Sequence, residues 1–308
     1  MSGGPAVIRR PFFEKSNTEL TSSLRANFAA HQPSPAPSKT NYTTWTNKTN
    51  SALYVPTHTP SPLTEPRESY DITVKLFYLP NIPTDRRCAQ TREAIELVLK
   101  ELGTSSVDLL IVSFPGLSFD ADDEDSDLDD DDDDAPSPPS ATQSTFENTA
   151  GDCPEAGAPP EDIETMVATW RSLEKLHAEG LVSKLGIAEF GVARLTKFLE
   201  QTKIKPSVNQ INVRDCCVVP KPLILYAKQQ QIELLTHNDC TNILPRGTLR
   251  QILGPGEDGS GVLAGNENED GLKGDVEPQW VVKYTAVVKD RGVVESKGYF
   301  AVAELRDS

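Results

Sequence analysis

The sequence predicts an α/β protein in which helices cover a parallel β-sheet, and three observations lead to this class. Short, nearly continuous apolar segments alternate with segments whose apolar residues recur at helical spacing. The chain of 308 residues is long enough to bury a sizeable core as one domain. Two apolar segments, at 72–78 and 107–112, flank an amphipathic helix as in a βαβ unit. Repeated units of this length fit a (β/α)8 barrel, although a doubly wound sheet would give similar local patterns.

Residues 1–70 are the least regular part of the sequence. They are rich in Ser, Thr, Asn and Pro and show no clear hydrophobic period. The apolar piece at 52–55 is a candidate strand, so any first strands of a barrel are expected in this region. We therefore divide the chain into an amino-terminal region, 1–70, and a barrel region, 71–308.

The barrel region begins with the βαβ unit. Its first strand, 72–78, is β-branched and aromatic, as strands prefer. Gly103 closes the helix that follows, because glycine readily adopts the left-handed conformation that ends helices. The apolar stripe of this helix consists of Ile95, Val98, Leu99 and Leu102.

An acidic, Pro- and Ser-rich insert at 117–160 interrupts the alternation. Residues 120–134 include twelve acidic residues and no basic one. The insert has too few apolar groups to offset the entropy of ordering, so we expect it to be disordered. The acidic run would suit a basic partner, but we interpret it as a solvated spacer that holds no catalytic residue.

After the insert the alternation resumes with a helix that ends at Gly180. The apolar stripe of this helix consists of Ile163, Met166, Val167, Trp170 and Leu173. The pattern then predicts strands at 183–187, 208–213 and 232–236, helices at 192–201 and 222–230, a Gly-rich loop at 254–274, and a last helix carrying Trp280, Tyr284, Val287 and Val288 on one face.

Composition and charge exclude several classes of protein. The formal net charge is −16, but twelve of the acidic groups lie in 120–134, which leaves −4 for the rest of the chain. This balance argues against a nucleic-acid binder, which needs a basic face, and an acidic run repels anionic lipid. No apolar run approaches a membrane span, and the first residues lack the apolar segment of a signal peptide. The five cysteines lack zinc-site spacing, so we expect no metal and a cytoplasmic protein with reduced thiols.

Several motifs follow one another in the order and spacing of the aldo-keto reductases. They lie at 102–104, 107–109, 180–190 and 209–211. On these motifs the chain resembles that family over about 71–240. The resemblance implies a (β/α)8 TIM barrel of aldo-keto reductase type, divergent or incomplete at the amino terminus, and favours it over the doubly wound sheet.

The catalytic residues that the resemblance implies are mostly missing. Members of the family reduce carbonyls with NADPH and use a tyrosine, a lysine, a histidine and an aspartate. Lys75 lies where the family has its lysine, but Ser113 takes the place of the histidine. Tyr42 and Tyr54 are in poorly patterned sequence, so no convincing aspartate and tyrosine pair lies upstream. We therefore expect no catalytic residue, with Lys75 and Ser113 as vestiges.

The residues that would bind the cofactor also depart from the family's pattern. Where the family has Ser-Asn before Phe to hold the nicotinamide, this chain has Ala-Glu before Phe190. Gln210 survives, His237 stands where a tyrosine would stack on nicotinamide, and Lys297 is a candidate remnant of the phosphate site. We expect no cofactor, and vestigial NADPH binding stays open.

A narrower resemblance explains these losses. The segments 75–77, 209–218, 234–239 and 291–299 are similar to the regulatory (modifier) subunits of glutamate-cysteine ligase. That resemblance implies a non-catalytic barrel that forms a heterodimer with the ligase's catalytic subunit, raises its affinity for glutamate and relieves feedback inhibition by glutathione.

Two alternatives remain beside this hypothesis: a divergent NADPH-dependent aldo-keto reductase, and a barrel-shaped binding module of another kind. Two site residues also have plain structural interpretations. Lys75 is expected to be a buried lysine satisfied by a carboxylate or a carbonyl, and His237 to be a hydrogen-bonded structural histidine.

Overall fold

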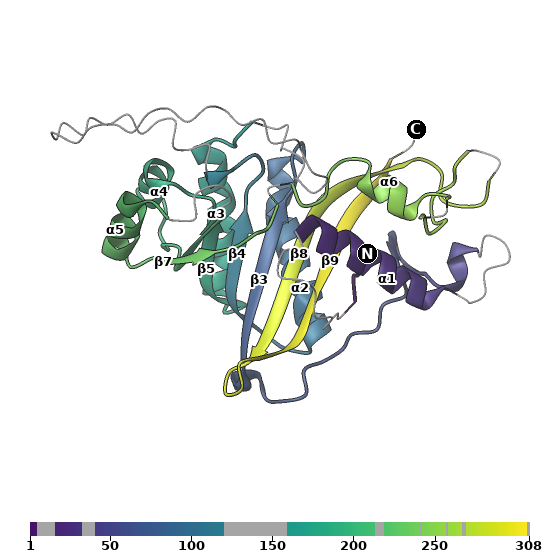
Figure 1. Cartoon of the computed structure of the whole chain (residues 1–308), viewed down its shortest axis with the longest axis horizontal. Helices are drawn as coiled ribbons and strands as arrows, with labels where there is room; N and C mark the ends of the chain where they lie inside the picture. The colour runs from purple at the N-terminus through teal and green to yellow at the C-terminus, as the bar shows by residue number, and fades with distance from the viewer. Residues whose placement is uncertain are drawn as a thin grey trace, which may run out of the picture.

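The centre of the protein is a seven-stranded mixed sheet with strand order β7-β6-β5-β4-β3-β8-β9 (Figure 1). The computed structural model describes residues 1–4, 16–32, 41–119, 159–212, 219–240, 242–256, 258–266 and 269–306. The strands of the sheet are β3 (Tyr70–Tyr78), β4 (Val107–Ser113), β5 (Val182–Ala188), β6 (Val208–Ile211), β7 (Glu233–Thr236), β8 (Asp275–Val288) and β9 (Val293–Arg306).

Strands β3 to β7 form the parallel half of the sheet. The helices that follow β3, β4, β5 and β6 are α2 (Arg87–Leu102), α3 (Ile163–Ala178), α4 (Val192–Leu199) and α5 (Lys221–Gln230). The elements predicted between 71 and 236 are confirmed, and the bounds predicted for them agree to within a few residues; α2 begins at Arg87, ahead of its predicted apolar stripe. Gly103 ends α2 in the left-handed conformation, at φ 63°, as expected. The predicted α/β class, with helices between the strands of a parallel sheet, is thus confirmed.

The last predicted helix is wrong. Trp280, Tyr284 and Val288 lie in strand β8, which runs antiparallel to β3 and pairs on its other side with β9. Both faces of β8 are buried: Trp280 packs in the core beneath the helices, and Val281 packs in a second core on the opposite face. A strand buried on both faces carries a continuous apolar run, which periodicity does not separate from a buried helix.

The described strands therefore form an open sheet, since β7 and β9 are its two ends and do not pair with each other. Five strands are parallel, where a complete barrel has eight. The candidate strand at 52–55 is present as β2 (Ala52–Tyr54), which pairs only with β1 (Asn47–Thr49) in a separate hairpin.

Helix α1 (Ser16–His31) lies across β8 and β9, as Figure 1 shows, and closes the second core. Its Leu20, Leu24 and Phe28 are buried there beside Val281 and Ala301. The short helix α6 (Thr248–Leu253) lies within the same core, and the 3-10 turns are η1 (Tyr42–Thr44), η2 (Arg67–Ser69) and η3 (Thr84–Arg86).

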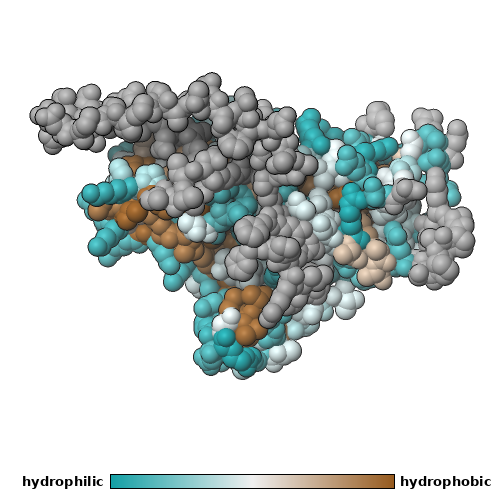
Figure 2. All heavy atoms as spheres, in the orientation of Figure 1, coloured by the Kyte–Doolittle hydropathy of each residue, from teal (hydrophilic) through white to brown (hydrophobic). Residues whose placement is uncertain are grey.

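The predicted insert begins too early, because Leu117 and Phe119 are buried in the core beneath the helices. The acidic run itself, within 120–158, lies outside the described residues. At the end of the molecule formed by α5 and β7, hydrophobic atoms gather on the surface in Figure 2, and Ile224 and Leu225 of α5 are exposed.

Two further expectations concern membranes and thiols. None of the helices in the described ranges combines the length and apolar character needed to cross a membrane. Cys240 is disulfide-bonded, so the expectation of reduced thiols is wrong for this residue, while Cys88 is free and exposed. Cys153, Cys216 and Cys217 lie outside the described residues.

Candidate functional site

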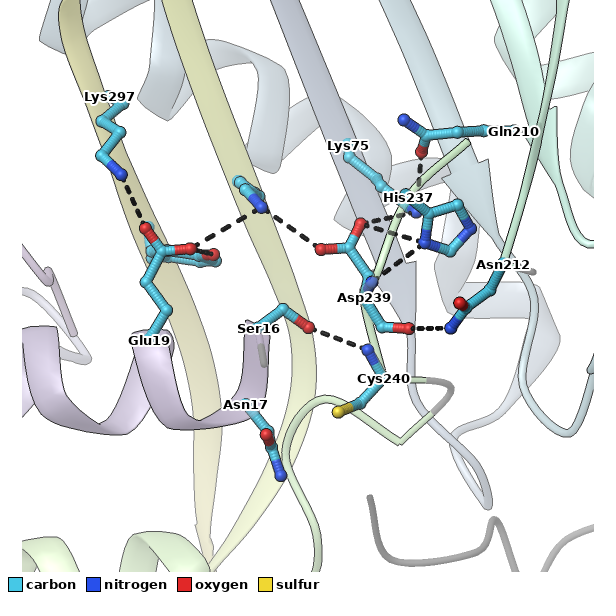
Figure 3. A network of polar contacts seen from close by, with 12 residues as sticks. Ser16, Asn17, Glu19, Lys75, Gln210, Asn212, His237, Asp239, Cys240 and Lys297 are labelled. Carbon is cyan, nitrogen blue, oxygen red and sulfur yellow. Dashed lines mark hydrogen bonds and ion pairs between the residues drawn. The ribbon is translucent and has the colours of Figure 1, made fainter. Parts of the chain in front are cut away.

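A buried cluster of charged side chains lies beside the carboxyl ends of the parallel strands (Figure 3). Its centre is an ion pair between Lys75 of β3 and Asp239, which follows β7 by three residues. The Lys75 Nζ donates to Asp239 Oδ2 at 2.7 Å and to the side-chain oxygen of Gln210 at 2.8 Å. The Lys75 and Asp239 side chains are only 5% and 6% exposed. The prediction of a buried lysine satisfied by a carboxylate is confirmed.

His237 and Glu189 extend this cluster toward β5. The Nε2 of His237 lies 2.8 Å from Glu189 Oε1, and both side chains are buried. The backbone N–H of Asp239 donates to His237 Nδ1 at 3.0 Å. His237 Nδ1 accepts this bond, so its prediction as a hydrogen-bonded histidine is confirmed, while Nε2 is close to Glu189 without forming a hydrogen bond of good geometry.

Glu189 is held by the backbone around it. It directly follows β5 and has a φ of 66°, a left-handed conformation that is uncommon for residues other than glycine. Its Oε2 accepts backbone N–H bonds from Phe119 at 3.2 Å and from Asn212 at 3.3 Å. The unusual backbone and these bonds fix the carboxylate in position beside His237.

Asp239 is the most strongly perturbed acid of the cluster. Burial would raise the pKa of its carboxyl, but the positive charges of Lys75 and Lys283 outweigh burial and hold this pKa well below its usual range. Lys283, from β8, lies 3.2 Å from Asp239 Oδ1. Burial lowers the pKa of Lys75, and the charge of Asp239 opposes that shift. Asp239 therefore stays ionised and compensates two ammonium groups.

A second acidic residue, Glu19 of α1, links the cluster to β9. Its carboxylate accepts from Lys297 Nζ at 2.8 Å and from the Tyr299 hydroxyl at 2.7 Å, and lies 3.8 Å from Lys283 Nζ. Burial raises the pKa of Glu19, but Lys297 and Lys283 hold the pKa below its ordinary value. The network thus joins α1, β8 and β9 to the ends of the parallel strands.

The structure brings three of the five sequence-predicted residues together. Lys75, Gln210 and His237 belong to one cluster, whereas Lys297 bonds to Glu19 at its far side. Ser113 is buried at the end of β4, beside β3, where Phe77 is its register partner. In the described part of the chain, Lys75 has no hydrogen bond to a tyrosine hydroxyl.

Four members of the cluster are not among the candidate residues that the sequence predicts: Glu189, Asp239, Glu19 and Lys283. Asp239 is 164 residues from Lys75 along the chain, and Glu19 lies in a region without a clear pattern. Lys283 was assigned to a helix, which hid its position opposite Lys75 in the β3–β8 register. A carboxylate three residues after a predicted strand was the one available signal, and it pointed to Asp239.

Comparison with known proteins agrees with the fold. A family model described as "Aldo/keto reductase family" matches residues 55–247. The "Putative glutamate-cysteine ligase regulatory subunit" of Schizosaccharomyces pombe is 25% identical over 255 residues, which cover 82% of this chain and 78% of the relative. The "Glutamate-cysteine ligase regulatory subunit" of Mus musculus is 25% identical over 242 residues, covering 79% of this chain and 69% of the relative.

Among solved structures, the aldose reductase from Schistosoma japonicum has a TM-score of 0.36 and 24% identity, and the match covers 55% of this chain and 46% of that one. The family model spans more than half of the sequence and includes the strands β3 to β7 that carry the cluster. The chain belongs to the aldo/keto reductase family.

Proposed function

We propose that this chain is a non-catalytic regulatory subunit of a glutamate-cysteine ligase. It forms a heterodimer with the ligase's catalytic subunit in the cytoplasm, raises the affinity for glutamate and relieves feedback inhibition by glutathione. Support comes from relatives that bear the name of this regulatory subunit and align with about four fifths of the chain. The geometric observation that carries the proposal is the complete pairing of Lys75 within the buried cluster.

A reductase of this family needs its lysine beside a tyrosine, because the lysine helps the phenol to deliver a proton to the carbonyl. Here the ammonium of Lys75 is directed to Asp239 and Gln210 and is almost completely buried. Ser113 replaces the histidine, and a hydroxyl at that position lacks the ring nitrogen that would orient a carbonyl. We therefore propose that the reductase tetrad is lost and that Lys75 and Ser113 are vestigial.

The residues present also do not fit NADPH. Glu189 stands in the segment where the family has the amide that holds the nicotinamide. Its carboxylate already accepts from two backbone N–H groups and lies 2.8 Å from His237 Nε2. Lys297, the candidate for the phosphate site, is paired with Glu19. Gln210 is bonded to Lys75. Because each candidate group is engaged with another residue of the chain, we propose no cofactor.

A non-catalytic subunit can regulate an enzyme only through a difference in binding affinity. A bound subunit shifts the catalytic subunit toward its active form only if it binds that form more tightly than the glutathione-inhibited form. Glutathione must then weaken the heterodimer by the same factor by which the heterodimer weakens glutathione binding. In this account the buried charge cluster is a rigid scaffold, and function resides in the outer surface.

The test is a ligase assay with the cognate catalytic subunit, in which glutathione is titrated with and without the full chain. The proposal expects the glutathione concentration for half-inhibition to rise when the chain is added. Bovine serum albumin at the same concentration is the control for non-specific stabilisation. If the inhibition curve is the same with and without the chain, the chain is not a regulator of this enzyme.

The second candidate, a divergent reductase, is favoured by the survival of Lys75 next to a buried carboxylate in a family of reductases. NADPH oxidation measured with a panel of aldehydes distinguishes the two functions. Carbonyl-dependent turnover that disappears in Lys75→Met would support the reductase and contradict the proposed loss of the tetrad. We expect no turnover by either protein.

A further inference from the structure

The outer edge of β9 is only partly occupied within the protein. Residues Met1 and Gly3 run antiparallel to it: Ala301 N–H donates to Met1 C=O at 3.0 Å, and Gly3 N–H donates to Tyr299 C=O at 3.0 Å. On the other side of this short strand, Ser2 N–H donates to Val55 C=O at 3.2 Å. The first residues are thus inserted between β9 and the end of the β1–β2 hairpin.

The same edge continues beyond this short strand. Backbone groups of a strand point alternately to its two sides, so Ala303 and Leu305 direct their N–H and C=O groups outward as Ala301 does. In the ranges that the structure describes, these outward groups have no backbone partner. Unpaired edge groups of this kind are a template for the addition of another strand.

A groove with a volume of about 850 Å³ lies along this free edge. One wall is β9 from Phe300 to Leu305, and the opposite wall includes β2 with Leu53 and Tyr54. The remaining lining is mainly apolar, with Leu97, Val262 and Leu263 among its residues. The charged lining residues are of both signs, Lys48 against Glu93 and Glu304, so the groove favours an apolar segment over a strongly charged one.

We propose that an extended, mainly apolar segment of the ligase's catalytic subunit binds in this groove as an antiparallel strand on β9, in line with Met1–Gly3. This inference rests on the proposed function and names the surface that performs it. Main-chain hydrogen bonds to Ala303 and Leu305 supply affinity, and alternate side chains of the segment enter the apolar lining. A strand of about five residues spans about 17 Å, which matches the free edge from Val302 to Arg306.

The shape of the groove favours this occupant over a second copy of the chain. A second copy would offer an edge strand, β7 or β9, that is already joined on its other side to β6 or β8, so it would bring at least two strands. The groove lies between β9 and the β1–β2 hairpin, in line with the place where the single strand Met1–Gly3 is held, and so suits one strand rather than a two-stranded ribbon. One strand covers only part of a standard interface of about 1,600 Å², so we expect other contacts to contribute.

A matched pair of variants tests the site. Leu305→Asp and Leu225→Asp each replace an exposed leucine, 46% and 57% exposed respectively, by one acidic residue. Leu305 lines the groove, whereas Leu225 lies on α5 at the other end of the sheet. We expect the Kd for the catalytic subunit, measured by surface plasmon resonance with the full chain, to rise about tenfold or more for Leu305→Asp and to stay within about threefold for Leu225→Asp.

A second variant addresses the backbone directly. Ala303→Pro removes an outward N–H and keeps the bonds to β8, so an edge strand tolerates it. Ala303→Thr keeps the N–H and is its control. We expect the proline variant alone to weaken binding by a similar factor, with thermal unfolding used to verify that both variants fold.

Hydrogen exchange on the unmodified protein tests the inference without any substitution. The amides of Ala303 and Leu305 should exchange rapidly in the free chain and slow by about tenfold or more when the catalytic subunit is added. If exchange is unchanged, or if Leu305→Asp and Ala303→Pro bind like the unmodified chain, the groove is not the binding site. The proposed function would still stand. Protection that grows with the concentration of the chain alone would identify a second copy as the occupant and also overturn the inference. If the unmodified chain does not bind the catalytic subunit, the proposed function fails and this inference fails with it.

Discussion

Asp239 determines the electrostatics of the buried cluster. Its carboxylate lies 2.7 Å from Lys75 Nζ and 3.2 Å from Lys283 Nζ, and its backbone carbonyl accepts from Asn212 at 3.0 Å. A buried charge is tolerated only when it is paired and hydrogen-bonded, because removing one partner leaves an uncompensated ion in a medium of low dielectric constant. The cluster is therefore a unit, and its residues should respond to substitution together.

Acid should destabilise the folded protein through the carboxylates of the buried cluster. Asp239 and Glu19 both have a pKa below the ordinary value, so the unfolded state binds protons first as the pH falls. Their contribution to stability is present above the unfolded pKa values of about 4 and is lost as the pH falls below about 5. Urea unfolding between about pH 7 and pH 3.5 should show the free energy of unfolding decreasing on the acid side.

The control for this prediction is Asp239→Asn, which should be less stable at neutral pH and should lose less stability in acid than the unmodified chain. Many other carboxylates contribute to acid unfolding, so the difference between the two proteins is the informative quantity. Equal losses would mean that Asp239 is not unusually acidic in the folded state.

The type of partner for Lys75 could be predicted from the sequence, but the identity of the partner could not. A lysine within a buried strand must be satisfied, which follows from its chemistry alone. That Asp239 does so depends on the loop after β7 turning back toward β3, a distance of 164 residues along the chain. Glu19 gave no signal, because the helix that carries it has no strong apolar stripe.

Among the elements, β8 is the one for which the sequence pattern does not distinguish a strand from a helix. Trp280, Tyr284 and Val288 are spaced by four, which fits one face of a helix, yet most of the residues between them are also apolar. The neighbouring β9 resolves the ambiguity, since it pairs with β8 over thirteen register positions and turns both into a long antiparallel ribbon. Strands β3 to β7 were easier to predict because helices with clear stripes separate most of them.

The glycines that follow α2 and α3 share a left-handed backbone but differ in the space around them. Gly103 has a φ of 63°, and an added Cβ would lie 2.8 Å from the Cβ of Pro62. Gly180, which follows α3, has a φ of 77°, and a Cβ there would meet nothing within 4 Å. Both Gly→Ala variants incur the left-handed strain of about 1–2 kcal/mol, but only Gly103→Ala adds a steric clash.

We therefore expect Gly103→Ala to lower the free energy of unfolding more than Gly180→Ala, as measured by urea denaturation of the full chain. The two glycines serve as controls for each other because they share the backbone conformation and differ in space. Equal effects would show that Pro62 moves away at little cost.

At the scale of the whole molecule, the protein is a half-barrel extended by an antiparallel ribbon. The parallel half keeps the strand ends at which enzymes of this architecture place their reactive groups. In this chain those ends are filled by Lys75, Glu189, His237 and Asp239, which are bonded to one another. The open edges of the sheet, β7 and β9, are surfaces that a closed barrel does not have.

The sequence could not reveal this arrangement. Local patterns identify βα units, but closure of a barrel depends on which strands meet at its seam, and that is a property of the whole chain. The resemblance to aldo-keto reductases predicted the family correctly and implied eight parallel strands, of which the described residues contain five.

If function resides in the outer surface and the buried cluster is only a scaffold, the double variant Lys75→Leu/Asp239→Leu should keep the regulatory effect. Replacing both partners of a buried ion pair by apolar residues of similar size is often nearly neutral for stability, whereas removing one costs about 3–5 kcal/mol. Lys283, the second ammonium that Asp239 compensates, is part-exposed and keeps Glu19 at 3.8 Å. The measurement is the glutamate KM of the catalytic subunit alone, with the unmodified chain and with the double variant, each verified as folded by thermal unfolding. We expect both chains to lower the KM to the same extent. If the unmodified chain does not change the KM, it is not a regulator of this enzyme. If a folded double variant binds the catalytic subunit but no longer lowers the KM, the cluster is more than a scaffold.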